Sequence, residues 1–160
     1  MPDATPCATL CAALLEKIGE QIERTTHLIS LVPDGRLDWR PHPDAWTTGE
    51  LIGHLLDCTS GFCAVLVAAE PQRLAHFAKL REMPATIENF QSHIEEGFAL
   101  LIDADLARRV PTVFVAQGEP ILTLLLGNLE HLINHKHQLF TYLKKMGVPV
   151  ATPDLYQFRG

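Results

Sequence analysis

The sequence is poor in positive charge. Its 160 residues include 13 Lys and Arg against 19 Asp and Glu, for a formal net charge of −6, and they form no dense basic run. Because a nucleic-acid surface needs a basic patch, this balance argues against nucleic acid as a partner. Long apolar runs are also missing, since the most apolar one, residues 121–126, is followed almost at once by Asn128, Glu130 and His131. We therefore expect no membrane span and no membrane partner.

Cysteine is scarce and irregularly placed. Cys7, Cys11, Cys58 and Cys63 show no zinc-ribbon spacing, and each lies in an apolar segment, where a free thiol packs as a small hydrophobic group. The N-terminal residues lack the basic region of a signal peptide. We expect a cytoplasmic protein with reduced thiols.

Several catalytic motifs are absent. A di-iron bundle needs Glu-x-x-His on paired helices, and a zincin needs Glu directly after the first His of its motif, where this sequence has Leu132. No glycine-rich phosphate loop and no G-x-S-x-G elbow occurs either. These absences argue against the corresponding classes of enzyme.

Helical periodicity dominates what is present. The length suits one domain covering residues 1–160, with no internal repeat or linker. Apolar residues recur at helical spacing in four segments: 5–30, 47–71, 86–101 and 120–147. The second has the best-marked start, because Thr47 and Glu50 have the spacing of a capping box. The pattern predicts an all-α four-helix bundle.

The connections between these helices carry turn-forming residues. A proline-rich loop over 32–45 joins the first two helices, and Trp39 and Trp46 either pin this loop to the bundle or wall a pocket. A short irregular helix is expected over 73–80. Before the last helix, Val113–Val115 followed by Gly118 predicts a short strand and turn, and hence a small β-hairpin.

The last helix is apolar on more than one side. Leu125, Leu132 and Leu139 lie on one flank, and Leu122, Leu129 and Phe140 lie further round. A bundle core buries one stripe, so the second flank needs cover from the Trp39 loop or from a second copy of the chain. We favour a homodimer.

The same helix carries the strongest candidate site. At roughly 100° per residue, His131 and His135 lie one turn apart on one face, close enough to hold one metal ion, whereas His137 lies well round the helix. Two histidines at this spacing are usually only solvated, but the surrounding sequence is too apolar for an exposed face. A third histidine, His54, occurs in the equally apolar second helix.

The motifs around these histidines resemble the DinB-like (YfiT-related) superfamily of metal-dependent proteins. The matching segments, which span nearly the whole chain, are Trp39-Arg40-Pro41, residues 46–51, His54-Leu55, and residues 128–138, 147–150 and 153–155. The resemblance implies a four-helix bundle, often dimeric, in which His54, His131 and His135 bind a divalent metal. Many members follow the last ligand with Arg-Gly-Gln, where this sequence has Lys136-His137-Gln138.

Five further side chains are candidates for roles around such a site: Glu50, Asp57, Asn128, Gln138 and Tyr142. Glu50 and Asp57, about one turn to either side of His54, either accept its hydrogen bond, serve as a general base, or are ordinary solvated acids. The other three either orient ligands or substrate or form a satisfied polar patch.

Three neutral imidazoles leave an ion its full charge and open coordination positions, as in catalytic rather than closed structural sites. They suit zinc or nickel, with iron and copper as alternatives. Because the similar proteins include thiol S-transferases and hydrolases, we predict a metal-dependent enzyme of small molecules, with a low-molecular-weight thiol as a candidate cosubstrate. The alternative is a non-catalytic, dimeric metal-binding or stress-response protein.

Overall fold

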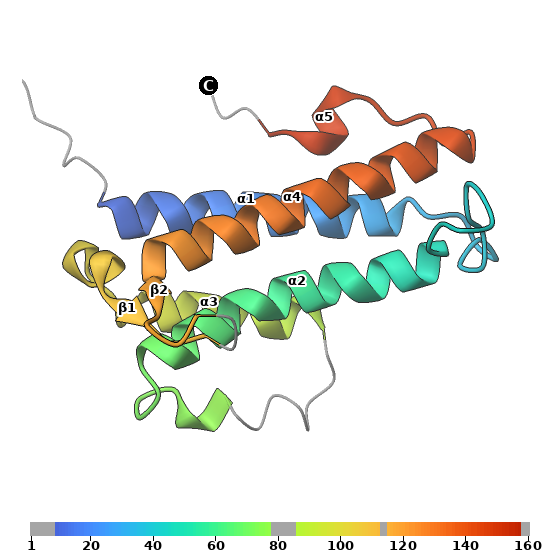
Figure 1. Cartoon of the computed structure of the whole chain (residues 1–160). Helices are drawn as coiled ribbons and strands as arrows, with labels where there is room; N and C mark the ends of the chain where they lie inside the picture. The colour runs from blue at the N-terminus through green and yellow to red at the C-terminus, as the bar shows by residue number, and fades with distance from the viewer. Residues whose placement is uncertain (1–8, 78–85, 113–114, 158–160) are drawn as a thin grey trace, which may run out of the picture.

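Four long helices form the body of the protein in a computed structural model that describes residues 9–77, 86–112 and 115–157 (Figure 1). They are α1 (Leu10–Ser30), α2 (Thr48–Ala69), α3 (Ile87–Phe98) and α4 (Ile121–Lys145). Helix α2 packs against α3 and α4, and α1 packs against the same two helices. The order around the bundle is therefore α1, α3, α2, α4, and the predicted all-α four-helix bundle is confirmed.

The helix starts follow local capping chemistry. Helix α2 begins at the predicted capping box: Glu50 N–H donates to Thr47 Oγ1 at 3.1 Å, and Thr47 N–H donates to Glu50 Oε2 at 2.7 Å. Helix α1 begins at Leu10, later than the predicted start near residue 5, and Thr9 is its N-cap. Residues 5 and 6 lie outside the described part of the chain. The carboxylate of Asp103 accepts the N–H groups of Leu10 and Cys11, which stabilises this helix end.

A small hairpin precedes the last helix, after a 3₁₀ helix, η2 (Asp103–Ala107). Strand β1 (Arg109–Val110) pairs antiparallel with β2 (Glu119–Pro120), with Val110 opposite Glu119. The sequence predicts a hairpin with a strand at 113–115; residues 113 and 114 lie outside the described ones, and Val115 is not in a strand. Gly118 closes the turn at φ 79°, and a Cβ there would meet the Val110 carbonyl at 2.7 Å. Residues 71–77 form turns and a short 3₁₀ segment.

Both apolar flanks of α4 are covered within the protomer. Leu125, Leu132 and Leu139 are fully buried, and Leu129 and Phe140 are nearly so. Helix α4 packs on α1, α2 and η2, and a short C-terminal helix, α5 (Thr152–Leu155), lies against α1 and α4. Its own chain thus buries most of the second flank of α4, where Leu122 is partly buried.

Helix α2 is the most apolar of the described helices. An 18-residue window in it has a mean hydropathy of 1.7, so by length and composition alone it could cross a membrane. This corrects the expectation that no segment reaches such a length. Of that window, 44% is buried inside the protein. The core helix of a soluble bundle passes the same test, and α2 packs here on both α3 and α4.

Candidate metal centre

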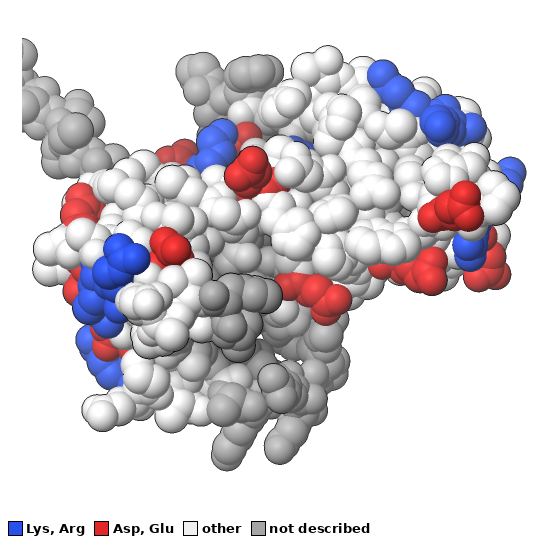
Figure 2. All heavy atoms as spheres, viewed as in Figure 1, with Lys and Arg blue, Asp and Glu red and all other residues white. Residues whose placement is uncertain are grey.

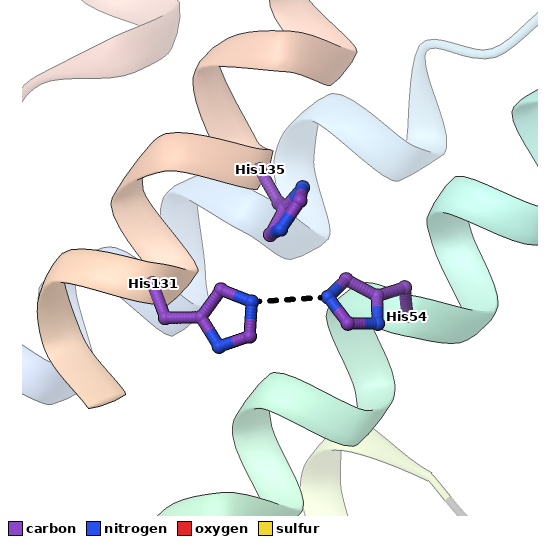
Figure 3. Close-up of side chains that lie close together, drawn as sticks. All are labelled: His54, His131 and His135. Carbon is purple, nitrogen blue, oxygen red and sulfur yellow. Dashed lines mark hydrogen bonds between the residues drawn. The ribbon is translucent and has the colours of Figure 1, made fainter. Parts of the chain in front are cut away.

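Three histidines meet where α2 and α4 face one another. His54 comes from α2, and His131 and His135 come from adjacent turns of α4 (Figure 3). Their candidate ligand atoms all lie within 4.8 Å of one another, and the Nε2 atoms of His54 and His131 are 3.1 Å apart. The structure therefore brings together the three side chains that the sequence singled out.

Packing behind the rings fixes the helices that carry them. Leu51 and Leu55 of α2 and Leu132 of α4 are fully buried beside the histidines. Two turns along α2 from His54, Gly61 allows close approach of the helices, since a Cβ there would meet Asn128 Oδ1 at 3.0 Å. Asn128 is therefore a contact between α2 and α4, and its role in orienting a ligand or substrate stays a prediction.

The electrostatics of the cluster favour neutral imidazole at His54. Burial lowers its pKa below the usual value, and the charges of His135 and His131 lower it further, while Asp57 acts weakly in the opposite direction. Neutral imidazole is the form with a free lone pair, so the shift favours the state that binds metal. Asp57 is exposed, and its effect on His54 is this electrostatic one.

Glu50 has a structural task. One of its oxygens accepts the Thr47 N–H of the capping box, and this hydrogen bond lowers the pKa of the carboxyl group. The Nε2 atom of His54 faces His131, and the predicted hydrogen bond from His54 to Glu50 stays a prediction.

A directed chain of hydrogen bonds leads away from His135. Its Nδ1 lies 2.9 Å from Gln138 Oε1, and the Gln138 Nε2 group donates to the Tyr142 hydroxyl at 3.4 Å. The Tyr142 hydroxyl then donates to the Trp46 carbonyl at 3.0 Å. Because an amide oxygen only accepts, His135 carries its proton on Nδ1 and presents the lone pair of Nε2. Gln138 and Tyr142 thus lie where the sequence predicted supporting residues.

The indole of Trp46 covers one side of the cluster. Its ring lies 5.5 Å from the His135 ring at an interplanar angle of 26°, and 4.8 Å from the His54 ring. Sequence reasoning offered Trp46 only as a pocket wall or loop anchor, and its position as the residue before the N-cap of α2 was the one available signal. The structure makes it a neighbour of two candidate ligands.

A cavity of about 400 Å³ opens beside the centre, between α4 and the loop that carries Trp46. Its walls include Trp46, His135, Gln138 and Tyr142, and Asp44 and Lys145 add charges of opposite sign. Of the three clustered histidines, only His135 lines this cavity. The cavity therefore lies on the Gln138 side of His135.

Among the other described histidines, His42 lines the cavity beside His135, His137 is exposed on α4, and three pair with groups away from the cluster. His27 Nε2 pairs with Asp154 at 2.7 Å, His76 Nε2 pairs with Glu96 at 2.9 Å, and His93 pairs with the carbonyl of Asn89. The first two partners are distant in sequence, so no local pattern could have indicated them.

The donor set fits a divalent transition metal. Imidazole nitrogen is a preferred ligand of zinc, nickel, iron and copper, and the group found among the described residues consists of three imidazoles. His131 is exposed, while His54 and His135 are half-buried, so one side of the group remains accessible from solvent.

Comparisons with known proteins agree with this architecture. A DinB-like protein, YjoA, from Bacillus subtilis has a solved structure that matches with a TM-score of 0.67, over 84% of this chain and 92% of that one, at 19% sequence identity. At this identity the likeness concerns the fold. No curated protein matches the chain. A family model of the DinB superfamily matches residues 18–139, which include all three clustered histidines. The chain belongs to the DinB superfamily.

Proposed function

We propose that the protein is a metal-dependent enzyme that acts on small molecules. The observation that carries the proposal is the convergence of His54, His131 and His135, whose ligand atoms lie within 4.8 Å of one another. A site made of three neutral imidazoles leaves a divalent ion its full charge and open positions, as catalytic sites do. The accessible side of the group admits a small substrate. Zinc or nickel is the proposed metal, with iron and copper as alternatives.

A divalent ion bound there would lower the pKa of a bound water or hold a thiol as its thiolate. The residues of the chain supply the setting for that chemistry. Gln138 holds His135 in the tautomer that presents Nε2, and the indole of Trp46 shields one side of His54 and His135 from water. We propose a thiol S-transferase-type reaction with a low-molecular-weight thiol, or a hydrolase-type reaction, in which these groups orient the reactants.

Metal analysis tests the proposal directly. Protein purified without a histidine tag should contain near-stoichiometric metal, as measured by inductively coupled plasma mass spectrometry. The His135→Ala variant should lose it, and His137→Ala should keep it, because His137 is exposed on the same helix outside the cluster. A wild type that stays free of metal after reconstitution with zinc and with nickel would refute the proposal.

Ligand binding separates an enzyme from a non-catalytic metalloprotein. In the cobalt-substituted protein, added 2-mercaptoethanol should produce a sulfur-to-cobalt charge-transfer absorption if a coordination position is open. A cobalt spectrum that responds neither to this thiol nor to azide would indicate a closed shell. The non-catalytic metal-binding role would then replace the catalytic one.

We also propose a homodimer and a cytoplasmic location. The face that α2 and α4 present in Figure 2 carries few charged side chains, and Leu126 of α4 is 46% exposed. The cysteines among the described residues, Cys11, Cys58 and Cys63, are free and buried, which suits a reducing compartment. Light scattering coupled to size-exclusion chromatography would give the oligomeric state.

A further inference from the structure

The loop over residues 31–47 reaches the candidate metal centre through Trp46, the residue before the N-cap of α2. It is attached to the first turn of α2, because Thr48 N–H donates to the Trp39 carbonyl at 2.8 Å and Gly49 N–H donates to the Leu37 carbonyl at 2.8 Å. It is attached to α4 through Tyr142, whose hydroxyl donates to the Trp46 carbonyl. The Tyr142 and Trp39 rings also pack edge to face, with their centroids 5.5 Å apart. Tyr142 thus joins both tryptophans of the loop to the helix that carries two ligands.

The hydrogen bonds from His135 to this loop all run in one direction. Nδ1–H donates to the Gln138 oxygen, the Gln138 amide donates to the Tyr142 hydroxyl, and this hydroxyl donates to the Trp46 carbonyl. If the loop leaves α4, the Tyr142 hydroxyl loses its acceptor and can turn to donate to the Gln138 oxygen. That oxygen would then be shared between Tyr142 and His135, and the His135 tautomer would be held less firmly.

We propose that Gln138 and Tyr142 are positioning residues that couple docking of the 31–47 loop to metal binding by His135. The proposal rests on the metal centre proposed above. Metal binding needs the lone pair of His135 Nε2, and the intact chain of hydrogen bonds favours the tautomer that provides it. By thermodynamic reciprocity, a bound metal then favours the docked loop by the same factor with which the docked loop favours the metal.

Docking of the 31–47 loop also places the Trp46 indole against the candidate ligands. With the loop in place, the Trp46 indole stacks on His135 and lies against His54. The same loop forms one wall of the cavity beside His135. A metal ion that stabilises the docked loop therefore closes one side of its own site and shapes the adjoining cavity.

The test measures loop protection and zinc affinity together. Hydrogen–deuterium exchange of the Thr48 and Gly49 amides, whose acceptors lie in the loop, should slow when zinc is added to the wild-type protein. Zinc affinity is measured in parallel by competition with a chromophoric chelator. Tyr142→Phe, which removes only the hydroxyl, should lose the zinc-dependent protection and bind zinc about 10–100-fold more weakly.

Two variants at position 138 separate the two parts of the hydrogen-bond chain, from His135 to Gln138 and from Gln138 through Tyr142 to Trp46. Gln138→Ala should weaken zinc binding about 10–100-fold and abolish the zinc-dependent protection. Gln138→Glu still accepts the His135 proton, so it should keep nearly wild-type zinc affinity and the wild-type cobalt spectrum. Its carboxylate takes the Tyr142 hydroxyl as a donor, which leaves the Trp46 carbonyl without one, so the loop protection should still be lost.

Controls make the outcome decisive. His137→Ala should behave as wild type in both measurements. The double variant Gln138→Ala/Tyr142→Phe should bind zinc no more weakly than the single variant with the lower affinity, because both substitutions break the same chain of hydrogen bonds. Zinc binding to the wild type without any change in loop exchange would overturn the inference and leave the metal centre standing. The inference would also be overturned if the two substitutions reduced the free energy of zinc binding additively in the double variant. Failure of the wild type to bind zinc would overturn the metal centre and the inference with it.

Discussion

Zinc should stabilise the fold through His131, and the size of the effect can be worked out. A ligand at 100 times its Kd that binds only the native state stabilises that state by about 2.7 kcal/mol. For a domain of this length, that corresponds to a rise in Tm of roughly 5–10 °C. Structural zinc sites with four ligands bind with about 10–16 kcal/mol, or roughly 3 kcal/mol for each ligand. Removing one ligand should therefore raise Kd by about 100-fold or more.

The perturbation is His131→Ala, with His137→Ala as the matched control. At the zinc concentration used for the wild type, the ratio of zinc to Kd in His131→Ala falls to about 1, and the remaining stabilisation falls to about 0.4 kcal/mol. Without zinc, both variants should melt within about 0.5 kcal/mol of the wild type, because both side chains are exposed. Differential scanning calorimetry of the wild type and both variants, with zinc and with a chelator, measures these differences in stability.

Two results would refute this reasoning. One is an equal zinc-induced rise in Tm for the wild type and His131→Ala, which would place the zinc elsewhere. The other is a loss of the rise in His137→Ala as large as that in His131→Ala. Either would mean that the convergence of imidazoles at 4.8 Å does not bind the ion.

Further predictions concern the scaffold. Gly97→Ala should destabilise the fold by about 1–3 kcal/mol in urea denaturation, because the new Cβ would lie 2.7 Å from Leu66 Cδ1. Gly19→Ala should stabilise the fold by about 0.5–1 kcal/mol, because a Cβ there meets nothing within 4 Å and alanine favours the helix. Lys136→Ala should cost about 2–4 kcal/mol, since it leaves a cavity and two buried acceptors without a donor. Hydrogen bonds from the first turn of α1 lower the pKa of Asp103 below 3.8, so its stabilising effect is complete above that pH and is lost as the pH falls through the folded-state pKa. Asp103→Asn should lower Tm at pH 7, and the difference from wild type should shrink in acid.

The bundle and the ligand helices were predictable because their signals are local. Helical periodicity marks the buried face of each segment, and the Thr47–Glu50 capping box marks the start of α2 within the chain itself. The pair His131 and His135 follows from the rise and turn of one helix. His54 joined the set through its apolar surroundings and the family resemblance. Nothing in periodicity alone states which helices face one another.

The surroundings of the site were harder to predict because they depend on tertiary placement. The sequence allowed Glu50 both as a cap and as a partner of His54, and only the fold shows its oxygen on the Thr47 N–H. The position of Trp46 over His54 and His135 depends on how the 31–47 loop docks, which neither helical periodicity nor a capping motif determines. The pairing of Arg109–Val110 with Glu119–Pro120 was not predicted, because strands of two residues are too short to show an alternating pattern in the sequence.

A buried side chain on another face of α4 helps to hold the rotation of this helix that directs His131 and His135 toward His54. Lys136 follows His135 directly, so its side chain leaves the helix about 100° away. It is 1% exposed, and its ammonium donates to Gln21 Oε1 at 2.6 Å and to the Leu155 carbonyl at 2.7 Å. Burial lowers the pKa of Lys136 to about 8, so at pH 7 it still donates as a cation. Rotation of α4 that turned His131 and His135 away from α2 would pull this cation from both acceptors. The buried lysine therefore ties α1 and the C-terminal segment to the rotational setting of α4 that presents both imidazoles to His54.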